Sequence, residues 1–406
     1  MKILVLTSCY PEPEDDSKVG ATPVVHYFAR EWVKSGHEVL VIHNANKFIL
    51  PLYLLPSFIK HKINSMVDMV FPKLSQRKAL YREMEGVKIK RIPILKVIPR
   101  CEFLPIQIKL QLRRIQKTLL EQDFIPDVMV GHWETPQIPL LSMLKEVYSC
   151  KAVEVFHGTH YIHKGIYYKK YRKYLESIDQ FGGRSPEIAR KVKESLKLQY
   201  DPFICYSGIP NEYIREYTRE RPEKRFEEMD AIHDFLYVGK LIDRKCVDSI
   251  ILALRDAYPM KNFHLNIIGV GACEASLRDM VDKFGLQEQI TFYGSLPREE
   301  VIKHMQYAQC FTMISSREVF GLVYLEAMSQ GCIVIASRNE GFDGIIVDGL
   351  NGFLCEAGNA QELSKVYERI NGLTQEEKEQ ISRNAVETAH HFTDSEVAKR
   401  YLKVFY

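Results

Sequence analysis

The chain has 406 residues, of which 46% are hydrophobic and 26% are charged, a balance typical of a globular protein of about two to three domains. This composition excludes disordered, collagen-like and coiled-coil proteins. Lysine and arginine number 55 against 52 acidic residues, and a net charge of +3 is too small for a protein that binds nucleic acid over its whole surface.

The nine cysteines are odd in number and widely scattered, without a Cys-x-x-Cys pair or a Cys/His cluster at metal-ligand spacing. They indicate a reducing, cytoplasmic compartment. The apolar run at the N-terminus is too short for a signal peptide, and the longest apolar stretch, residues 48–59, is shorter than the ~20 residues that span a bilayer. We therefore expect no helix that spans a membrane. A segment that lies on a membrane surface is not excluded.

Short apolar runs of β type alternate with helical patterns along the first half of the chain. The predicted strands and helix are Ile3–Thr7, a helix over 23–35, Val39–Ile42, Val128–Val130 and Ala152–Phe156. Alternation of this kind indicates βαβ units and a parallel sheet covered by helices. Because ligands of such sheets bind at the carboxyl ends of the strands, candidate site residues are sought there.

A glycine-containing loop, Lys18-Val-Gly20-Ala21-Thr22, lies between the first strand and the first helix. Glycine allows the backbone to approach a ligand closely, and the helix N-terminus behind the loop attracts anions. The loop is predicted to contact a phosphate or an acceptor, with an ordinary connection as the competing interpretation.

Residues 47–117 hold 16 lysines and arginines and only four acids, so this stretch carries +12 and the rest of the chain −9. Apolar side chains such as Tyr53, Phe58 and Phe71 are interleaved with the cations. This mixture suits an element that rests on anionic lipid, where each cation contributes about 1 kcal/mol. We predict peripheral membrane contact through residues 48–117, and a solvated basic face with buried apolar residues is the alternative.

Polar and aromatic residues follow two predicted strands in the first half. His132, Trp133 and Glu134 come after Val128–Val130, and His157 comes directly after Ala152–Phe156, with His160 three residues further on. A lone histidine is more often structural than functional. His157 is nevertheless a candidate site residue, because it lies at the carboxyl end of a predicted strand.

A charged stretch over 215–230 precedes a second βαβ series. Its predicted strands are Phe235–Val238, His264–Ile268, Ile290–Tyr293, Cys310–Ile314 and Cys332–Ala336. Two successive parallel-sheet domains, divided between about residues 210 and 230, fit the length better than one large sheet.

The most informative segment runs from Ser315 to Ala336: a strand end, a polar loop, a helix beginning near Phe320 or Gly321, a C-capping glycine and a strand. The first backbone N–H groups of that helix, those of Gly321, Leu322 and Val323, lack intrahelical acceptors and form an anion socket. Glu318 lies just ahead of the socket and Glu326 two turns further along, where both can accept hydrogen bonds from ligand hydroxyls. The alternative is that the two acids only complement the helix dipole or are solvated.

The segment from Tyr237 to Lys245 contains a glycine at a strand end, Gly239, followed by Lys240 and Lys245. The glycine allows the backbone to turn close to a ligand, and the two lysines can converge on a diphosphate as point charges. Lysines in loops are usually solvated, so this pattern alone is weak.

Two further glycine turns follow predicted strands of the second half. Gly269 and Gly271 form a Gly-x-Gly turn without the third glycine of a dinucleotide-binding fingerprint, because position 274 is Glu274. Hydride chemistry is therefore disfavoured. Gly294 belongs to a Tyr-Gly-Ser turn, and tight turns without function are the competing interpretation.

Taken together, these segments resemble the donor-binding signature of the retaining GT-B glycosyltransferases of family four. The signature has two glutamates flanking seven residues with Phe-Gly-Leu between them, and it continues here through Glu-Ala-Met, the C-capping glycine, Glu340-Gly341, Asp348-Gly349 and Asn351-Gly352-Phe353. The resemblance covers essentially the whole chain and is strongest from about 235 to 356.

The resemblance implies an α/β fold of the GT-B type, in which two Rossmann-like parallel-sheet domains face each other across a cleft. An acceptor-binding domain would cover residues 1–210, with a C-terminal helix at about 392–406 packed back on it, and a donor-binding domain would cover 211–391. Closure about a hinge at 210–230 would then be the expected gating step.

The resemblance also assigns roles to individual residues of the second half. Glu318 would contact the donor sugar, Glu326 the ribose, and the backbone after Phe320 the diphosphate, through Gly321, Leu322 and Val323. Lys240 and Lys245 would bind the diphosphate, although the family has arginine in place of Lys240 and glycine in place of Cys246. Arg244 is a possible substitute donor.

Roles that the resemblance gives to turns and to the first half are less specific. Gly269, Gly271 and Gly294 would lie near the nucleotide, and Gly20 near the donor phosphate. His157 matches a histidine that faces the reacting sugar. The acceptor side would be lined by His132, Trp133, Glu134 and His160.

The predicted function is that of a retaining hexosyltransferase in polysaccharide biosynthesis, with a nucleotide-diphosphate donor, a UDP-sugar favoured, and a glycan or lipid-linked acceptor. No second acid is placed for a double displacement, so the family's front-face substitution is expected, with His157, Glu318 and Lys245 as catalytic residues. The sequence has no Asp-x-Asp motif, and we expect no metal or other cofactor. A nucleotide-sugar epimerase on the same fold and a non-catalytic nucleotide-sugar binding protein remain alternatives.

Overall fold

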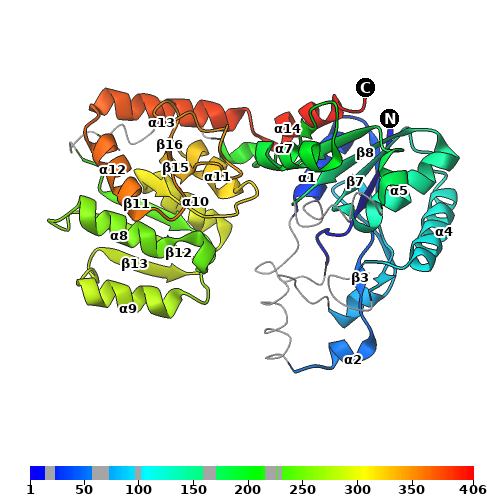
Figure 1. The fold of residues 1–406 in the computed structure, drawn as a ribbon, viewed down its shortest axis with the longest axis horizontal. Helices are drawn as coiled ribbons and strands as arrows, with labels where there is room; N and C mark the ends of the chain where they lie inside the picture. The colour runs from blue at the N-terminus through cyan, green and yellow to red at the C-terminus, as the bar shows by residue number, and fades with distance from the viewer. Residues whose placement is uncertain (14–22, 57–72, 97–101, 159–170, 215–225, 227–230) are drawn as a thin grey trace. The chain divides into compact units, whose positions relative to one another are not determined.

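The computed structural model describes residues 1–13, 23–56, 73–96, 102–158, 171–214, 226 and 231–406 (Figure 1). The chain forms two compact units. The N-terminal unit comprises residues 1–184, 188–205 and 398–406, and the C-terminal unit comprises residues 185–187 and 206–397. The chain therefore passes into the C-terminal unit after Cys205 and returns to the N-terminal unit after Val397.

The N-terminal unit is built on an eight-stranded sheet in the order β10-β9-β8-β7-β1-β2-β5-β4. All neighbouring strands are parallel except the antiparallel pair β4 and β5. The strands are β1 Lys2–Thr7, β2 Glu38–His43, β4 Leu80–Met84, β5 Val87–Arg91, β7 Val128–His132, β8 Lys151–Phe156, β9 Gln180–Gly183 and β10 Phe203–Ile204, and a separate parallel pair is formed by β3 Asn46–Lys47 and β6 Ile94–Leu95.

Helices cover this sheet on both faces, as a parallel sheet requires. Those of the N-terminal unit are α1 Val24–Lys34, α2 Leu50–Tyr53, η1 Leu74–Arg77, α4 Pro105–Glu121, α5 Glu134–Tyr148 and α7 Pro186–Leu196. Helix α1 packs on β2 and β5, whereas α4 and α5 pack on each other, and α5 covers β7 and β8.

The last helix, α14 Asp394–Leu402, carries the chain back to the N-terminal unit. The ring of Tyr401 lies 5.3 Å from that of Phe28 and 5.2 Å from that of Trp32, and Phe405 packs on Trp32 as well. The indole N–H of Trp32 donates to the carbonyl oxygen of Ala398 at 3.2 Å. The C-terminal segment thus completes the apolar layer on the α1 side.

The antiparallel hairpin β4–β5 lies inside the basic stretch and was not predicted. In β5 the apolar residues Val87 and Ile89 are buried while Lys88 and Lys90 are half-exposed, an alternation that the high density of cations obscured. The hairpin turns at Glu85 and Gly86, both with positive φ (49° and 79°), as a two-residue hairpin loop requires.

The C-terminal unit is built on a six-stranded, fully parallel sheet in the order β13-β12-β11-β14-β15-β16. Its strands are β11 Asp234–Val238, β12 His264–Ile268, β13 Ile290–Gly294, β14 Cys310–Thr312, β15 Ile333–Ser337 and β16 Phe353–Cys355. The predicted α/β class with two parallel-sheet domains is confirmed. The strand order reverses between β11 and β14, which is the switch point where ligands of doubly wound sheets bind.

Two helical layers cover the second sheet. The helices of this unit are α8 Val247–Ala257, α9 Glu274–Phe284, α10 Arg298–Tyr307, α11 Leu322–Ser329, α12 Ala360–Asn371 and α13 Gln375–His390, with short 3₁₀ turns η2 Asn211–Tyr213 and η3 Asp243–Lys245. Helix α8 packs on α9 and α12, and α11 packs on α10 and α13. No helix in the described ranges has the length and apolar character needed to cross a membrane.

Candidate functional site

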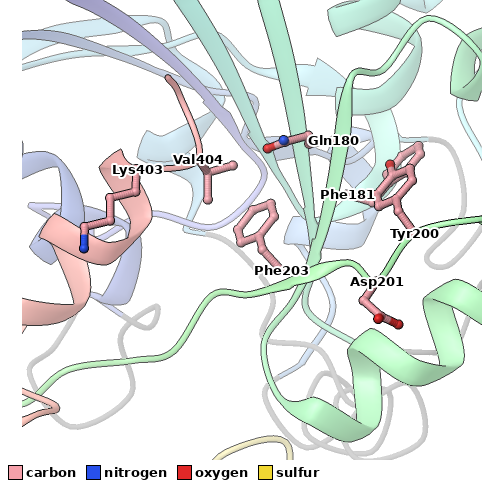
Figure 2. A pocket seen from close by; sticks show the side chains of 7 residues that line it. All are labelled: Gln180, Phe181, Tyr200, Asp201, Phe203, Lys403 and Val404. Atoms are coloured by element: carbon pink, nitrogen blue, oxygen red, sulfur yellow. The ribbon is translucent and has the colours of Figure 1, made fainter.

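The N-terminal unit has two candidate sites. The first is a hollow of about 220 Å³ (Figure 2). It is lined by Gln180, Phe181, Tyr200, Asp201, Phe203, Lys403 and Val404. Because Gln180 and Phe203 begin β9 and β10, the hollow lies at the amino ends of these two neighbouring strands. Ligands of parallel sheets bind at the carboxyl ends, so the hollow is not the predicted site.

The second feature is a histidine pair at the carboxyl ends of β7 and β8. Nδ1 of His132 and Nε2 of His157 are 2.9 Å apart, and the ring of Trp133 is stacked on that of His157 with centroids 3.7 Å apart. The hydroxyl of Tyr401 lies 3.4 Å from Nε2 of His132. The structure thus brings three of the predicted residues together and adds Tyr401, which no sequence pattern indicated.

Burial lowers the pKa of both His132 and His157 well below the usual value, and the positive charge of Arg184 lowers both further. His132 also lowers the pKa of His157. Both rings are therefore neutral at neutral pH, and one ring N–H donates to the other ring's lone pair. Such a pair can hold a fixed tautomer at the carboxyl edge of the sheet.

Two buried glutamates lie behind the histidine pair. Glu134 begins α5, and burial raises its pKa to about 7. Glu154 of β8 is fully buried, and neither of its carboxyl oxygens has a hydrogen-bond partner in the described part of the chain. Its pKa is raised well above the usual value, first by burial and then by the charge of Glu134. Gly131 leaves room for it, because a Cβ at that position would lie 1.9 Å from Oε2 of Glu154. Sequence reasoning missed Glu154.

Glu318 is the centre of the site on the C-terminal unit. Nζ of Lys245 lies 2.5 Å from Oε2 of Glu318, and the hydroxyl of Ser315 donates to the same oxygen at 3.1 Å. Nη1 of Arg244 lies 3.7 Å away. The side chains of Lys245 and Glu318 are only 10% and 13% exposed, so they form a largely buried ion pair. Lys245 follows β11 and Glu318 follows β14, which places both at the switch point.

The loop that carries Glu318 is held by Glu340. Its two carboxylate oxygens accept hydrogen bonds from the backbone N–H groups of Arg317 (2.8 Å) and Glu318 (2.7 Å). A Cβ at Gly341 would lie 2.1 Å from the carbonyl oxygen of Val319. The Glu-Gly pair of the signature therefore shapes the loop.

Helix α11 begins at Leu322, directly after Gly321, which has a φ of +80°. A Cβ at Gly321 would meet the ring of Tyr324 at 2.5 Å and the side chain of Glu318 at 3.4 Å, so the helix start lies beside Glu318. The backbone around Leu322 and Val323 is half-buried, and no acceptor from the described residues takes these N–H groups. The positive end of the helix dipole and free donors thus lie next to the Lys245–Glu318 pair.

The three predicted cations differ in their surroundings. Lys245 is buried against Glu318, whereas Lys240 is exposed and makes no ion pair with the described residues. Nη1 of Arg244 is buried without a hydrogen-bond partner in the described ranges. Arg244 therefore offers an unused donor beside the site. Cys246 has φ +51°, a conformation that explains the family's preference for glycine there.

Gly269 and Gly271 are required for close packing of two loops. A Cβ at Gly269 would lie 1.8 Å from the carbonyl oxygen of Gly239, and one at Gly271 would lie 2.1 Å from that of Leu241. Gly294 has φ +65°, and its carbonyl oxygen accepts the N–H of Gly269 at 2.7 Å. These glycines bring the ends of β11, β12 and β13 together at one edge of the sheet.

Glu326 lies about one turn into α11 and is almost buried, with a side chain 7% exposed. Nη2 of Arg298 donates to its Oε1. The guanidinium of Arg298 also lies over the ring of Tyr213, 5.4 Å from its centroid. Sequence reasoning missed Arg298, because a basic residue at a helix start carries no signal of its own.

Gly20 and His160 lie outside the described residues, as do Lys18, Ala21 and Thr22 of the glycine-containing loop. Among the residues that the structure does describe, no three histidine, cysteine or acidic side chains are grouped as metal ligands.

Comparisons with known proteins agree with this fold. Residues 218–388 match the family described as glycosyl transferases group 1. An uncharacterised glycosyltransferase of Methanocaldococcus jannaschii is 26% identical over 354 residues, 86% of this chain and 92% of that protein. The amylovoran biosynthesis glycosyltransferase AmsK of Erwinia amylovora is 27% identical over 265 residues, 62% of each chain.

Among solved structures, that of Anabaena HepE in complex with UDP superposes with a TM-score of 0.65 at 15% identity, covering 100% of this chain and 99% of that one. At this identity the likeness shows the fold. With the family match over residues 218–388 and the named relatives, it supports a GT-B glycosyltransferase of group 1.

Proposed function

We propose that the chain transfers a hexose from a nucleotide-diphosphate donor, with a UDP-sugar favoured, to a hydroxyl of a glycan or lipid-linked acceptor in polysaccharide biosynthesis. The observation that carries the proposal is the constellation at the β11/β14 switch point, where Lys245, Arg244 and the start of α11 adjoin the carboxylate of Glu318. Cations and free N–H groups suit a diphosphate, and carboxylates suit sugar hydroxyls. The name of the amylovoran relative and the UDP bound by HepE support the substrate class.

The proposed reaction is a front-face substitution with retention. The acceptor oxygen forms a bond to the anomeric carbon on the face from which the diphosphate leaves, and the acceptor proton passes to the departing diphosphate oxygen. Lys245, Arg244 and the α11 N-terminus stabilise the charge that grows on the diphosphate. Glu318 orients the donor sugar by accepting from its hydroxyls. This chemistry requires no metal, and His157 is the residue of the N-terminal unit that we propose takes part in it.

A thermal-shift screen with UDP-, GDP- and ADP-sugars in EDTA tests the donor class. A nucleotide sugar at 100 times its Kd adds about 2.7 kcal/mol to the free energy of unfolding, which corresponds to a rise of roughly 5–10 °C in Tm. The rise should shrink to about half or less in Lys245→Ala, whose affinity is expected to fall at least tenfold, and it should persist in Lys303→Gln, which removes an exposed cation from α10. Equal shifts in both variants would contradict the assigned site.

Transfer and stereochemistry are tested with the donor that binds. Incubation with lipid and glycan acceptors should release the nucleoside diphosphate, and the anomeric proton coupling of the product in ¹H NMR should match that of the donor. An inverted product would exclude the retaining mechanism. Epimerised donor without an acceptor would indicate the epimerase alternative, and binding without turnover would indicate the non-catalytic one.

The membrane contact predicted for residues 48–117 has a defined counterpart on α4. The outward stripe of this helix, with spacings of three and four residues, consists of Ile106, Lys109, Leu110, Arg113, Lys117 and Leu120. All six side chains are exposed, Leu120 by 83%, and none is acidic. The opposite face is buried in the core through residues such as Ile108, Ile115 and Leu119. We propose that this stripe rests on anionic lipid.

Vesicle co-sedimentation tests this proposal. The triple variant Lys109→Glu, Arg113→Glu and Lys117→Glu should lose binding to vesicles containing phosphatidylglycerol by 100-fold or more, because each cation contributes about 1 kcal/mol and the reversal adds repulsion. A matched triple variant of exposed lysines on the C-terminal unit, Lys283→Glu, Lys303→Glu and Lys365→Glu, should bind like the wild type. Wild-type binding that is independent of the anionic lipid would overturn the proposal.

A further inference from the structure

Arg298 joins three elements of the C-terminal unit. It is the first residue of α10, it donates to Oε1 of Glu326 on α11, and it lies over the ring of Tyr213 in η2. Tyr213 is held in turn, because Nε2 of Gln330 donates to its carbonyl oxygen at 2.6 Å. The Arg298 side chain is 43% exposed, but its guanidinium contacts Glu326 on one side and the ring of Tyr213 on the other.

The contact with Arg298 uses only one of the two carboxylate oxygens of Glu326 and leaves the other available to a ligand. Arg298 engages Oε1, and no donor from the described residues reaches Oε2. A carboxylate can accept about four hydrogen bonds, so Oε2 and the remaining lone pair of Oε1 can take ligand hydroxyls while the guanidinium stays in place. The planar guanidinium also fixes the orientation of the carboxylate, which an ammonium group would not do.

We infer that Arg298 is a positioning residue for the donor ribose: it holds Glu326 so that Oε2 accepts a ribose hydroxyl. The inference rests on the proposed function, because it requires a nucleotide in the site. Arg298 would then help the site to bind ribonucleotides more tightly than deoxyribonucleotides. The almost complete burial of Glu326 supports it, since a buried carboxylate without a partner is costly and lacks a fixed orientation.

The test compares each nucleoside diphosphate with its 2′-deoxy and 3′-deoxy analogues. UDP, GDP and ADP are titrated calorimetrically into the full-length protein in EDTA, and the nucleotide that binds most tightly is used for all variants. In the wild type, loss of the hydroxyl that Glu326 binds should weaken binding about tenfold, which corresponds to about 1.4 kcal/mol.

The variants separate positioning from folding. Glu326→Gln and Arg298→Gln should reduce the ribose preference to threefold or less while the affinity for the deoxy analogue is retained. Arg298→Lys should restore part of the preference, since it keeps the charge without the planar group. Lys303→Gln, which removes a cation from the same helix without touching Glu326, should keep the full preference.

Two results would overturn the inference. Arg298→Gln could keep the full ribose preference, or it could weaken ribose and deoxyribose forms equally, which would mark a purely structural role. If no nucleotide binds the wild type, the proposed function fails and the inference fails with it. A wild type that binds nucleotides with a ribose preference insensitive to Arg298 contradicts the inference alone.

Discussion

Glu318 and Lys245 form an ion pair, so a diphosphate that binds Lys245 competes with the carboxylate of Glu318. A diphosphate must draw Lys245 away from a carboxylate 2.5 Å distant, so part of its attraction to the cation is lost. The same carboxylate is proposed to bind the donor sugar. The two partners of one ion pair should therefore respond differently to substitution.

Glu318→Gln should bind UDP as well as the wild type or up to about tenfold more tightly, because Lys245 is no longer neutralised. Its sugar-transfer rate should fall 100-fold or more, since a contact to the reacting sugar is lost. The free variant should also be less stable, because an unpaired buried charge costs about 3–5 kcal/mol. Calorimetry with UDP and a transfer assay check both quantities, and parallel losses of UDP binding and transfer would contradict the account.

Glu154 makes stability depend on pH in a defined direction. Its folded-state pKa is raised, so the folded protein keeps a proton that the unfolded chain loses above about pH 4.3. The free energy of unfolding should fall as pH rises from there to the folded pKa. Glu134, with a pKa of about 7, adds a second decrease between pH 4.3 and 7.

Glu154→Gln should remove one of these two contributions and reduce the slope by up to about 1.4 kcal/mol per pH unit. Urea unfolding from pH 5 to 8, followed by tryptophan fluorescence, measures it, because both tryptophans, Trp32 and Trp133, belong to the N-terminal unit. An unchanged slope would show that Glu154 is not protonated in the folded state.

The sequence singled out Glu318, Lys245 and the N-terminus of α11 because their order along the chain matches a signature, and the structure brings these three together. Their role in donor binding stays a prediction. Arg298 and Tyr401 were missed because each contacts its partner, Glu326 or His132, from an element 28 or 269 residues away along the chain. Only the fold brings such pairs together.

At the element scale, buried parallel strands were predicted almost to the residue, because they are continuous apolar runs. Helix α11 was expected to begin near Phe320 or Gly321 and begins at Leu322. Short or irregular strands near the two edges of the first sheet were missed: β9 ends in two glycines, β10 has two residues, and β5 of the β4–β5 hairpin alternates buried apolar residues with lysines. Such strands depend on their neighbours for stability more than on their own apolar pattern.

The return of α14 to the N-terminal unit should contribute strongly to that unit's stability. Tyr401→Ala should lower its free energy of unfolding by about 3–5 kcal/mol, because the ring fills a buried space against Phe28 and Trp32. Tyr401→Phe keeps the ring and should cost about 1 kcal/mol or less. Urea unfolding by tryptophan fluorescence distinguishes the two, and equal losses would contradict a packing role.

The lysines and arginines that give residues 47–117 their net charge of +12 fall into two groups in the folded molecule. Some of these cations are used internally: Arg91 is buried against Glu12 at 2.8 Å, and Lys88 pairs with Glu38 at 2.8 Å. Others, such as Lys109 and Arg113 on α4, point outward beside exposed apolar side chains. Net charge along the sequence could not separate the two groups, because pairing depends on the fold.

We propose that the C-terminal unit binds a nucleoside diphosphate through Lys245 without a metal. Calorimetric titration of UDP, GDP and ADP in EDTA into the wild type, Lys245→Ala and Lys303→Gln tests it most directly. At least one nucleotide should bind the wild type and Lys303→Gln alike, and Lys245→Ala should bind it at least tenfold more weakly. Equal binding by Lys245→Ala, or no binding by the wild type, would contradict it.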